Sequence, residues 1–291
     1  MEALRRRIEA RVMSLSGLAL GQIDYEHPEG DPGLFGPDSM PWEVHSDFTS
    51  MLVGGIASLL LQMLHPLALA GVWDHSNFRQ DMLGRLRRTG QFVAGTSFAP
   101  TASADWLIDK VRSIHLKVTG TAADGRRYAA SDPALLTWVH VAEVSCFLAG
   151  YLRYLNPQLS GAEQDRYYAE IALVAERLGA TDVPKSRQAV ADYLDAMRPQ
   201  LVCDERTREI CRILLNAPAP SRSAAPISRL FMQAGIDLLP AWTQQQLGLQ
   251  QAAWQHPLIR AGVHSLAPIL RWAVRNGASH RSRKRMGLPP R

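Results

Sequence analysis

A chain of 291 residues, 46% of them hydrophobic, has enough apolar material for a sizeable core, which excludes an intrinsically disordered protein. The formal net charge of +5 equals the charge of the last eleven residues, where no acid balances Arg281, Arg283, Lys284, Arg285 and Arg291. The three cysteines include no CxxC or CxxCH spacing, which excludes a zinc finger, a disulfide scaffold and covalent c-type haem, and favours a cytoplasmic location.

Helical periodicity dominates the chain and predicts an all-α protein with one domain. A basic, amphipathic first helix is expected at the N-terminus, and a Pro/Gly-rich approach segment follows at 22–42. The periodicity predicts helices at 43–71, 78–92, 103–119, 132–155, 161–178, 186–198, 204–215, 226–234 and 240–247. Asp124-Gly125 between short β-tolerant flanks predicts a small hairpin near 119–130. The basic C-terminal tail has the charge to contact nucleic acid or an anionic membrane, but we expect a solvated terminus without specific nucleic-acid binding.

Two apolar stretches, 51–64 and 135–152, have to be distinguished from membrane spans. The first is too short and contains Gln62, and the second carries His140 and Glu143 near its middle. Ionisable side chains are costly in hydrocarbon. We therefore expect buried core helices and no transmembrane segment.

Several well-known catalytic motifs are missing from the chain. There is no GxGxxG after a strand, no Walker loop, no GxSxG, no HExxH and no Glu-x-x-His of the kind that a helical di-iron bundle uses. His140 and Glu143 give the reverse order once, on one helix face. A hydrogen bond between them is the preferred interpretation, and a metal or cofactor role for His140 is the alternative.

His115 is the histidine whose setting best suits a ligand. Leu107, Val111, Ile114, His115 and Val118 recur at helical spacing, which predicts that the imidazole lies on an apolar stripe facing the core. Taken alone, such a histidine is more often a core residue bonded to a carbonyl. A haem ligand needs the same environment: a neutral ring, apolar walls and an acceptor for the second nitrogen.

A basic turn lies upstream of His115. If this segment is helical, Arg85 and Thr89 lie one turn apart, and Asp81 lies one turn before Arg85 and is expected to pair with it. An arginine held in this way can anchor a carboxylate or polarise bound oxygen. The alternative is a solvated basic face, and composition does not decide between the two.

An ordered series of short motifs resembles the DUF2236 family, which includes latex-clearing rubber oxygenases and the oxygenase MpaB. The motifs are His65-Pro66, Gly71-Val72-x-Asp74-His75-Ser76, Gly84-Arg85-Leu86-x-x-Thr89, His115-x-x-Val118-x-Gly120, Gly125-x-x-Tyr128-x-Ala130-x-Asp132-Pro133, Trp138-Val139-His140, Tyr168-x-Glu170, Leu178-Gly179, Pro184, Met197-Arg198-Pro199-x-Leu201, Leu239-Pro240 and Leu247-Gly248-Leu249. The resemblance implies a family domain at 43–250, between an N-terminal helix and loop segment at 1–42 and a C-terminal extension at 251–291. It also implies a globin-like helical fold, haem b and dioxygen chemistry.

The resemblance assigns roles to individual residues of this chain. It implies that His115 is the axial iron ligand, and that Arg85 and Thr89 line the distal side. Two positions depart from the rubber enzymes. Arg88 stands where they can place a distal lysine, and a guanidinium is a poor ligand, so the sixth iron position is expected to be open or water-filled. Between Gln62 and Arg85 there is no glutamate to act as their base, which leaves His65 and His75 as proton-transfer candidates.

The sequence thus predicts a haem b-dependent oxygenase for a small to medium apolar substrate and dioxygen, with an electron donor as a further partner. Its cofactor-binding residues would be His115, Arg85, Arg88 and His140. The alternatives are a haem peroxygenase or peroxidase, a non-enzymatic haem carrier or sensor, and a helical protein without haem in which His115 is only a core residue.

Overall fold

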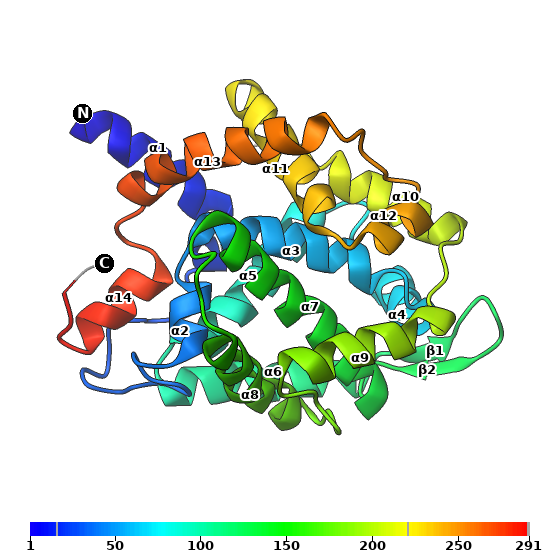
Figure 1. Ribbon diagram of the computed structural model, residues 1–291. Helices are drawn as coiled ribbons and strands as arrows, with labels where there is room; N and C mark the ends of the chain where they lie inside the picture. Colours follow the sequence, from blue (N-terminus) through cyan, green and yellow to red (C-terminus); the bar gives the residue numbers. More distant parts are fainter. Residues whose placement is uncertain (16, 220, 290–291) are drawn as a thin grey trace.

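The computed structural model describes residues 1–15, 17–219 and 221–289, which form fourteen α-helices, three 3₁₀ segments and one two-stranded hairpin (Figure 1). This confirms the prediction of an all-α protein. The elements are α1 (Glu2–Leu15), η1 (Gly17–Leu20), α2 (Met40–His45), α3 (Phe48–Gln62), α4 (Pro66–His75), α5 (Met82–Phe98), α6 (Thr101–His115), β1 (Thr119–Thr121), β2 (Arg127–Ala129), α7 (Pro133–Tyr154), α8 (Gly161–Leu178), α9 (Arg187–Met197), η2 (Arg198–Gln200), α10 (Glu205–Leu215), η3 (Arg222–Ala224), α11 (Ala225–Leu238), α12 (Ala241–Leu247), α13 (Gln255–Ala273) and α14 (Ala278–Arg285).

Helices α3 and α7 cross at the centre of the molecule, and glycines let their backbones touch (Figure 1). A Cβ atom on Gly54 would lie 2.8 Å from the carbonyl oxygen of Cys146, and one on Gly150 would lie 2.7 Å from that of Ser50. No side chain fits at either point. The pair is then surrounded by apolar side chains from α10, α11 and α13, which complete the largest part of the core.

The single helix expected at 43–71 is wrong, because the chain turns twice within it. Asp47 is extended and caps α3, accepting a hydrogen bond from the Ser50 amide at 2.9 Å. Pro66 then begins α4 after an extended His65, since a residue before proline avoids the helical conformation. The axes of α3 and α4 differ by 103°.

Helix α7 is long and apolar enough to cross a membrane, and so is the bent pair α3 and α4 when taken together. However, 72% of the apolar window of α7 is buried inside the protein. Its position against α3 is that of a core helix, as its internal His140 and Glu143 predicted.

The hairpin is confirmed, with Gly120 opposite Tyr128 in antiparallel register and Gly125 at φ 85° in the turn. Two of the preceding helices end at residues other than those predicted. Helix α6 ends at His115 rather than at 119 because the chain turns into β1, and α5 continues to Phe98, six residues beyond its expected end.

The C-terminal region differs most from expectation. It contains α13 and α14, which the sequence did not predict. Arg285 in the basic tail is only 2% exposed and donates hydrogen bonds to the carbonyl oxygens of Tyr25, Asp31 and Phe98 at 2.7–2.8 Å. The expectation of a solvated terminus is therefore wrong for this helix, because Arg285 ties it to the approach segment and to the end of α5.

Candidate active site

The first turn of α5 sets the direction of its arginines. Asp81 caps the helix, and its carboxylate accepts a hydrogen bond from the Gly84 amide at 2.7 Å. A Cβ atom on Gly84 would lie 1.9 Å from a carboxylate oxygen of Asp81, so a larger residue here would require the capping carboxylate to move. The expected pair between Asp81 and Arg85 does not form. The capping carboxylate instead lies 3.6 Å from Nη1 of Arg88, on the solvent side of the helix.

Arg85 points to the other side, into the protein. Its Nη1 donates a hydrogen bond to Oγ of Ser76 at 3.0 Å. Burial lowers the pKa of the guanidinium to about 10, with a smaller contribution from the positive charge of Arg88. Arg85 therefore remains charged at neutral pH and acts as a hydrogen-bond donor rather than as a base.

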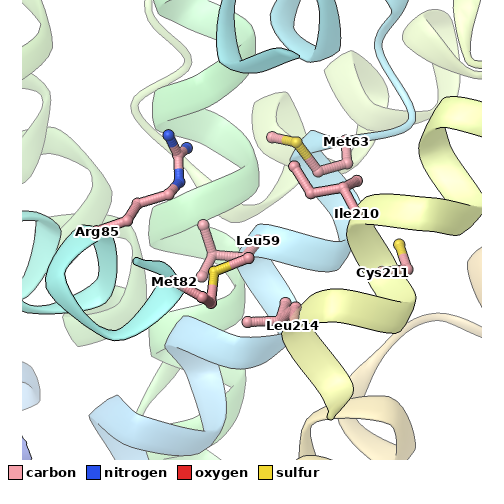
Figure 2. A pocket seen from close by; sticks show the side chains of 7 residues that line it. All are labelled: Leu59, Met63, Met82, Arg85, Ile210, Cys211 and Leu214. Atoms are coloured by element: carbon pink, nitrogen blue, oxygen red, sulfur yellow. The ribbon is translucent and has the colours of Figure 1, made fainter. Parts of the chain in front are cut away.

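Arg85 lines a small apolar cavity of about 10 Å³, which has room for about one water molecule (Figure 2). The other lining residues are apolar or weakly polar and come from α3, the turn after it, α5 and α10: Leu59, Met63, Met82, Ile210, Cys211 and Leu214. Burial raises the pKa of the Cys211 thiol to about 12, so this cysteine is not a nucleophile. Arg85 is thus the one charged residue among those that line the cavity, and the surface that faces the cavity is almost entirely apolar.

Thr89 and Arg88 lie on the same helix but do not line this pocket. Thr89 is half-buried one turn after Arg85, as the spacing predicted. The side chain of Arg88 is 57% exposed and directed to Asp81. Among the arginines at 85, 87 and 88, only Arg85 is one of the residues that line the cavity.

His115 ends α6, the helix that packs directly against α5. Its ring is half-buried, and Nδ1 is buried without a hydrogen-bond partner. Burial lowers the pKa of the imidazole, which is therefore neutral at pH 7. The apolar stripe expected around it is incomplete: Leu107 is buried, but Ile114 is 50% exposed because the helix ends at the surface.

The other two candidate histidines hold local structure. Nδ1 of His65 accepts from the amides of Leu67 and Ala68 at 3.3 and 3.4 Å, so this ring caps α4. Burial lowers the pKa of His65 to about 4. Nε2 of His75 lies 3.1 Å from both the Thr119 carbonyl oxygen and the Tyr128 hydroxyl, which joins α4 to the hairpin. Their role in proton transfer stays a prediction.

His140 and Glu143 lie deep in α7, but no hydrogen bond joins them, so the preferred interpretation of this pair is wrong. Burial lowers the pKa of His140 to about 4 and raises the pKa of Glu143 to about 7. Glu143 nevertheless keeps part of its surface accessible. In the sequence, the position of Glu143 as a lone acid in the apolar stretch 135–152 was the signal that this side chain is buried.

One buried polar chain was missed by the sequence analysis. Nδ1 of His45 lies 2.7 Å from Oγ of Ser97, and Nε2 lies 2.8 Å from the hydroxyl of Tyr167, which links α2, α5 and α8. Burial lowers the pKa of His45 to about 3, and nearby His140 adds to this. No periodicity in the sequence marks His45, because its partners lie 52 and 122 residues away.

Comparison with known protein families shows which family the chain belongs to. Residues 42–272 match the family model described as "ER-bound oxygenase mpaB/B'/Rubber oxygenase, catalytic domain". The chain belongs to this family. No curated protein and no solved structure matches it. The matched range contains Arg85, Thr89, His115, His140 and Glu143, so the site lies within the oxygenase catalytic domain.

This mpaB/rubber oxygenase domain has few side chains that are placed to ligate a metal ion. Within the described parts of the chain, no group of three or more His, Cys, Asp or Glu side chains is placed to hold a metal ion. His115 stands alone as a neutral imidazole with a buried, unused nitrogen. Such a residue suits a cofactor that brings most of its own ligands.

Proposed function

We propose that this member of the mpaB/rubber oxygenase family binds haem b through His115 and oxidises a small to medium apolar molecule. The observation that carries the proposal is the unpartnered imidazole of His115 on the helix next to the Arg85 pocket. Among the described residues, six buried side-chain N or O atoms have no hydrogen-bond partner, and Nδ1 of His115 is the one that belongs to an imidazole, the side chain that ligates haem iron. Leaving such an atom unpaired costs about 1–3 kcal/mol of desolvation free energy. A bound group would remove this cost.

The chemistry of the donor set fits a porphyrin. A porphyrin supplies four nitrogen ligands to its iron, so a single neutral imidazole from the protein completes the proximal side. A non-haem iron centre would need three or more side chains, and the described residues do not assemble them. The absence of CxxC and CxxCH fits a haem that is held without thioether bonds.

When bound, the haem supplies dioxygen activation, and the surrounding residues direct it. Arg85 offers a cation and planar hydrogen-bond donors at the edge of an apolar pocket, where electrostatic interactions are stronger than in water. Thr89 supplies a hydroxyl one turn further along α5. Leu59, Met63 and Leu214 give the cavity beside Arg85 apolar walls, which favour contact with apolar groups.

The positions of two residues support an open sixth coordination site. Arg88 lies at the surface and pairs with Asp81, so it does not reach inward. His65 uses Nδ1 to cap α4. Glu143, whose pKa burial raises to about 7, is a better candidate for proton exchange than either His65 or His75.

The test is the absorption spectrum of the purified protein and of two matched variants. We expect a Soret band, a pyridine haemochrome spectrum of b-type haem and one haem per chain. His115→Ala should lose the haem. His280→Ala, which removes a half-buried histidine from α14, should keep it. Full haem content with an unchanged spectrum in His115→Ala would refute the assignment of the ligand, and a colourless wild-type protein after haem addition would refute the cofactor.

A further inference from the structure

Three consecutive residues at the end of α4 contact two different parts of the candidate site. Asp74 and His75 bind the hairpin of β1 and β2, which packs beside α4 (Figure 1). The next residue, Ser76, accepts the hydrogen bond from Nη1 of Arg85 at 3.0 Å. The amide of Ser76 donates to the carbonyl oxygen of Val72 at 3.1 Å, so this residue is held by the last turn of α4. The end of α4 therefore connects the hairpin to Arg85.

The hydroxyl of Tyr128 in β2 is the centre of the contact between α4 and the hairpin. It donates to Oδ2 of Asp74 at 2.7 Å and lies 3.1 Å from Nε2 of His75. The same Nε2 lies 3.1 Å from the carbonyl oxygen of Thr119. Because a carbonyl oxygen only accepts hydrogen bonds, Nε2 carries the proton, and the Tyr128 oxygen accepts from it. Burial raises the pKa of Tyr128 to about 12, with a further contribution from Asp74, so the hydroxyl remains a donor at neutral pH.

The hairpin is also joined to the end of α6, where His115 lies. The amide of Val118 donates to the carbonyl oxygen of His115 at 3.1 Å, and the carbonyl oxygen of Val118 accepts from the amide of Ala130 at 2.8 Å. Gly120 pairs with Tyr128 in the hairpin, and a Cβ atom on Gly120 would lie 2.6 Å from the Tyr128 hydroxyl oxygen. The tyrosine therefore packs directly on the strand that follows His115, and a movement of its side chain would be passed to that turn.

We infer that Tyr128 is a positioning residue of the oxidation site, because its hydroxyl fixes the end of α6, which carries His115, relative to Arg85. The path leads from the Tyr128 hydroxyl to the last turn of α4, and from Ser76 in that turn to Arg85. Tyr128 does not line the cavity beside Arg85, so it acts through the other two residues and not on a substrate. The inference rests on the proposed function for the roles of His115 and Arg85, but the contacts themselves do not require haem.

The alternative is that Tyr128 only packs the hairpin against α4. Its ring would be sufficient for that, since it forms a small apolar cluster with Ala70 and Ala122. The two interpretations differ in what the hydroxyl does. Tyr128→Phe separates them, because it keeps the ring and removes both hydrogen bonds of the hydroxyl. Tyr193→Phe is the matched control, since it removes the hydroxyl of a half-buried tyrosine on α9, which has no part in this path.

The first experiment is amide hydrogen exchange of the full chain as purified, resolved by NMR. In Tyr128→Phe we expect the amides of Ser76 and Val118 both to exchange at least about threefold faster, because the end of α4 and the turn after His115 lose their common contact. Neither amide should change in Tyr193→Phe. A change at only one of the two amides, a change at neither, or an equal change in the control would overturn the inference.

The second experiment adds azide to the haem-loaded ferric protein, because the guanidinium of Arg85 would stabilise this anion. Tyr128→Phe should shift the EPR g-values, which depend on the orientation of the His115 ring, and should weaken azide binding at least about threefold. Ser76→Ala should weaken azide binding without shifting the g-values, because it frees Arg85 and leaves the hairpin in place.

A conservative variant distinguishes positioning from a general loss of structure. Asp74→Asn keeps an oxygen that can accept from Tyr128 and should retain the wild-type g-values and azide affinity, whereas Asp74→Ala should behave like Tyr128→Phe. Unchanged g-values and azide affinity in Tyr128→Phe would overturn the inference. A protein that takes up no haem would refute the proposed function instead, and the exchange experiment would still show whether Tyr128 joins the two segments.

Discussion

Nη1 of Arg85 donates a hydrogen bond to Oγ of Ser76 at 3.0 Å, which joins the first turns of α5 to the end of α4. This contact replaces the expected ion pair with Asp81. The guanidinium is held by a neutral hydroxyl rather than by an acid, so this partner does not neutralise its positive charge.

Arg85→Lys keeps the charge but loses the planar donor group that reaches both Ser76 and the pocket. We expect unchanged helix content, most of the haem retained, and a rate per bound haem at least about tenfold lower, which corresponds to ~1.4 kcal/mol of barrier. Arg87→Lys, on the same helix with its guanidinium bound to the Ser14 carbonyl oxygen, is the matched control and should retain its rate. An unchanged rate per haem in Arg85→Lys would exclude the catalytic role. Loss of haem in proportion to activity would assign Arg85 to a propionate.

The resting ferric protein should be five-coordinate or weakly bound to water, because Arg88 is at the surface and His65 is used as a helix cap. Added imidazole, cyanide or azide should therefore convert the absorption and EPR spectra to a low-spin form. A resting spectrum that is already low-spin and resists imidazole would show that a second side chain occupies the iron.

Glu143→Gln tests the buried acid through stability, without haem. Burial raises the pKa of Glu143 from 4.5 to about 7, so between these pH values the folded state holds a proton that the unfolded state has lost. Stability from this group is then highest below pH 4.5 and falls as pH rises to about 7, by at most ~3 kcal/mol.

The glutamine variant has no group that titrates at this position. Its free energy of unfolding should therefore rise relative to that of the wild type between pH 4.5 and 7, and the difference should be constant at higher pH. Urea denaturation of both apoproteins across this range measures the difference. His45, His65 and His140 act in the opposite direction, because their pKa values are lowered by burial, but they are common to both proteins and cancel. Parallel stability curves for the two proteins would mean that Glu143 is not desolvated.

Gly54→Ala should destabilise the fold, because its Cβ atom would meet the Cys146 carbonyl oxygen at 2.8 Å and force α3 and α7 apart. Overpacking of this kind costs about 1–3 kcal/mol. Gly55→Ala is the matched control: its Cβ atom meets only Phe147 at 3.8 Å, so the better helix propensity of alanine should stabilise it by up to ~1 kcal/mol. Thermal unfolding compares the two, and equal effects would show that the helices do not touch at Gly54.

Local signals predicted part of the fold well. Helices α7 and α8 lie within one residue of expectation because their caps are encoded nearby, by Asp132 in front of Pro133 and by Ser160 and Gly179 around α8. The break in the helix before α3, in contrast, depends on a distant residue. Asp47 is held by Arg271, with Nε to Oδ1 at 2.7 Å, and that partner lies 224 residues further along the chain. Helix α13 was missed because Pro257 and Pro268 resemble helix breaks in the sequence, although the helix accommodates both.

The candidate site, too, could be predicted only in part from the sequence. The motif order identified the family, and the helical spacing placed Thr89 one turn after Arg85. Helical spacing alone predicted the wrong partner for Asp81 and a hydrogen bond in the His140–Glu143 pair that does not form. Side chains three or four residues apart on a helix are close enough to interact, but each can bind another group instead. Asp81 binds the amide of Gly84 instead, and burial shifts the pKa values of His140 and Glu143 without a hydrogen bond between the two side chains. Neither outcome can be predicted from a helical repeat.

The contacts of Arg285 also set an order of events during synthesis. The carbonyl groups of Asp31 and Tyr25 appear 254 and 260 residues before the guanidinium that serves them. At about 5–20 residues per second, the donor follows its acceptors by roughly ten seconds to one minute. Helices α3 and α7 are both synthesised within that interval, so their crossing can form before Arg285 is available. The contacts that tie down the turns before α2 can therefore form only after α5, α6 and α7 have been made.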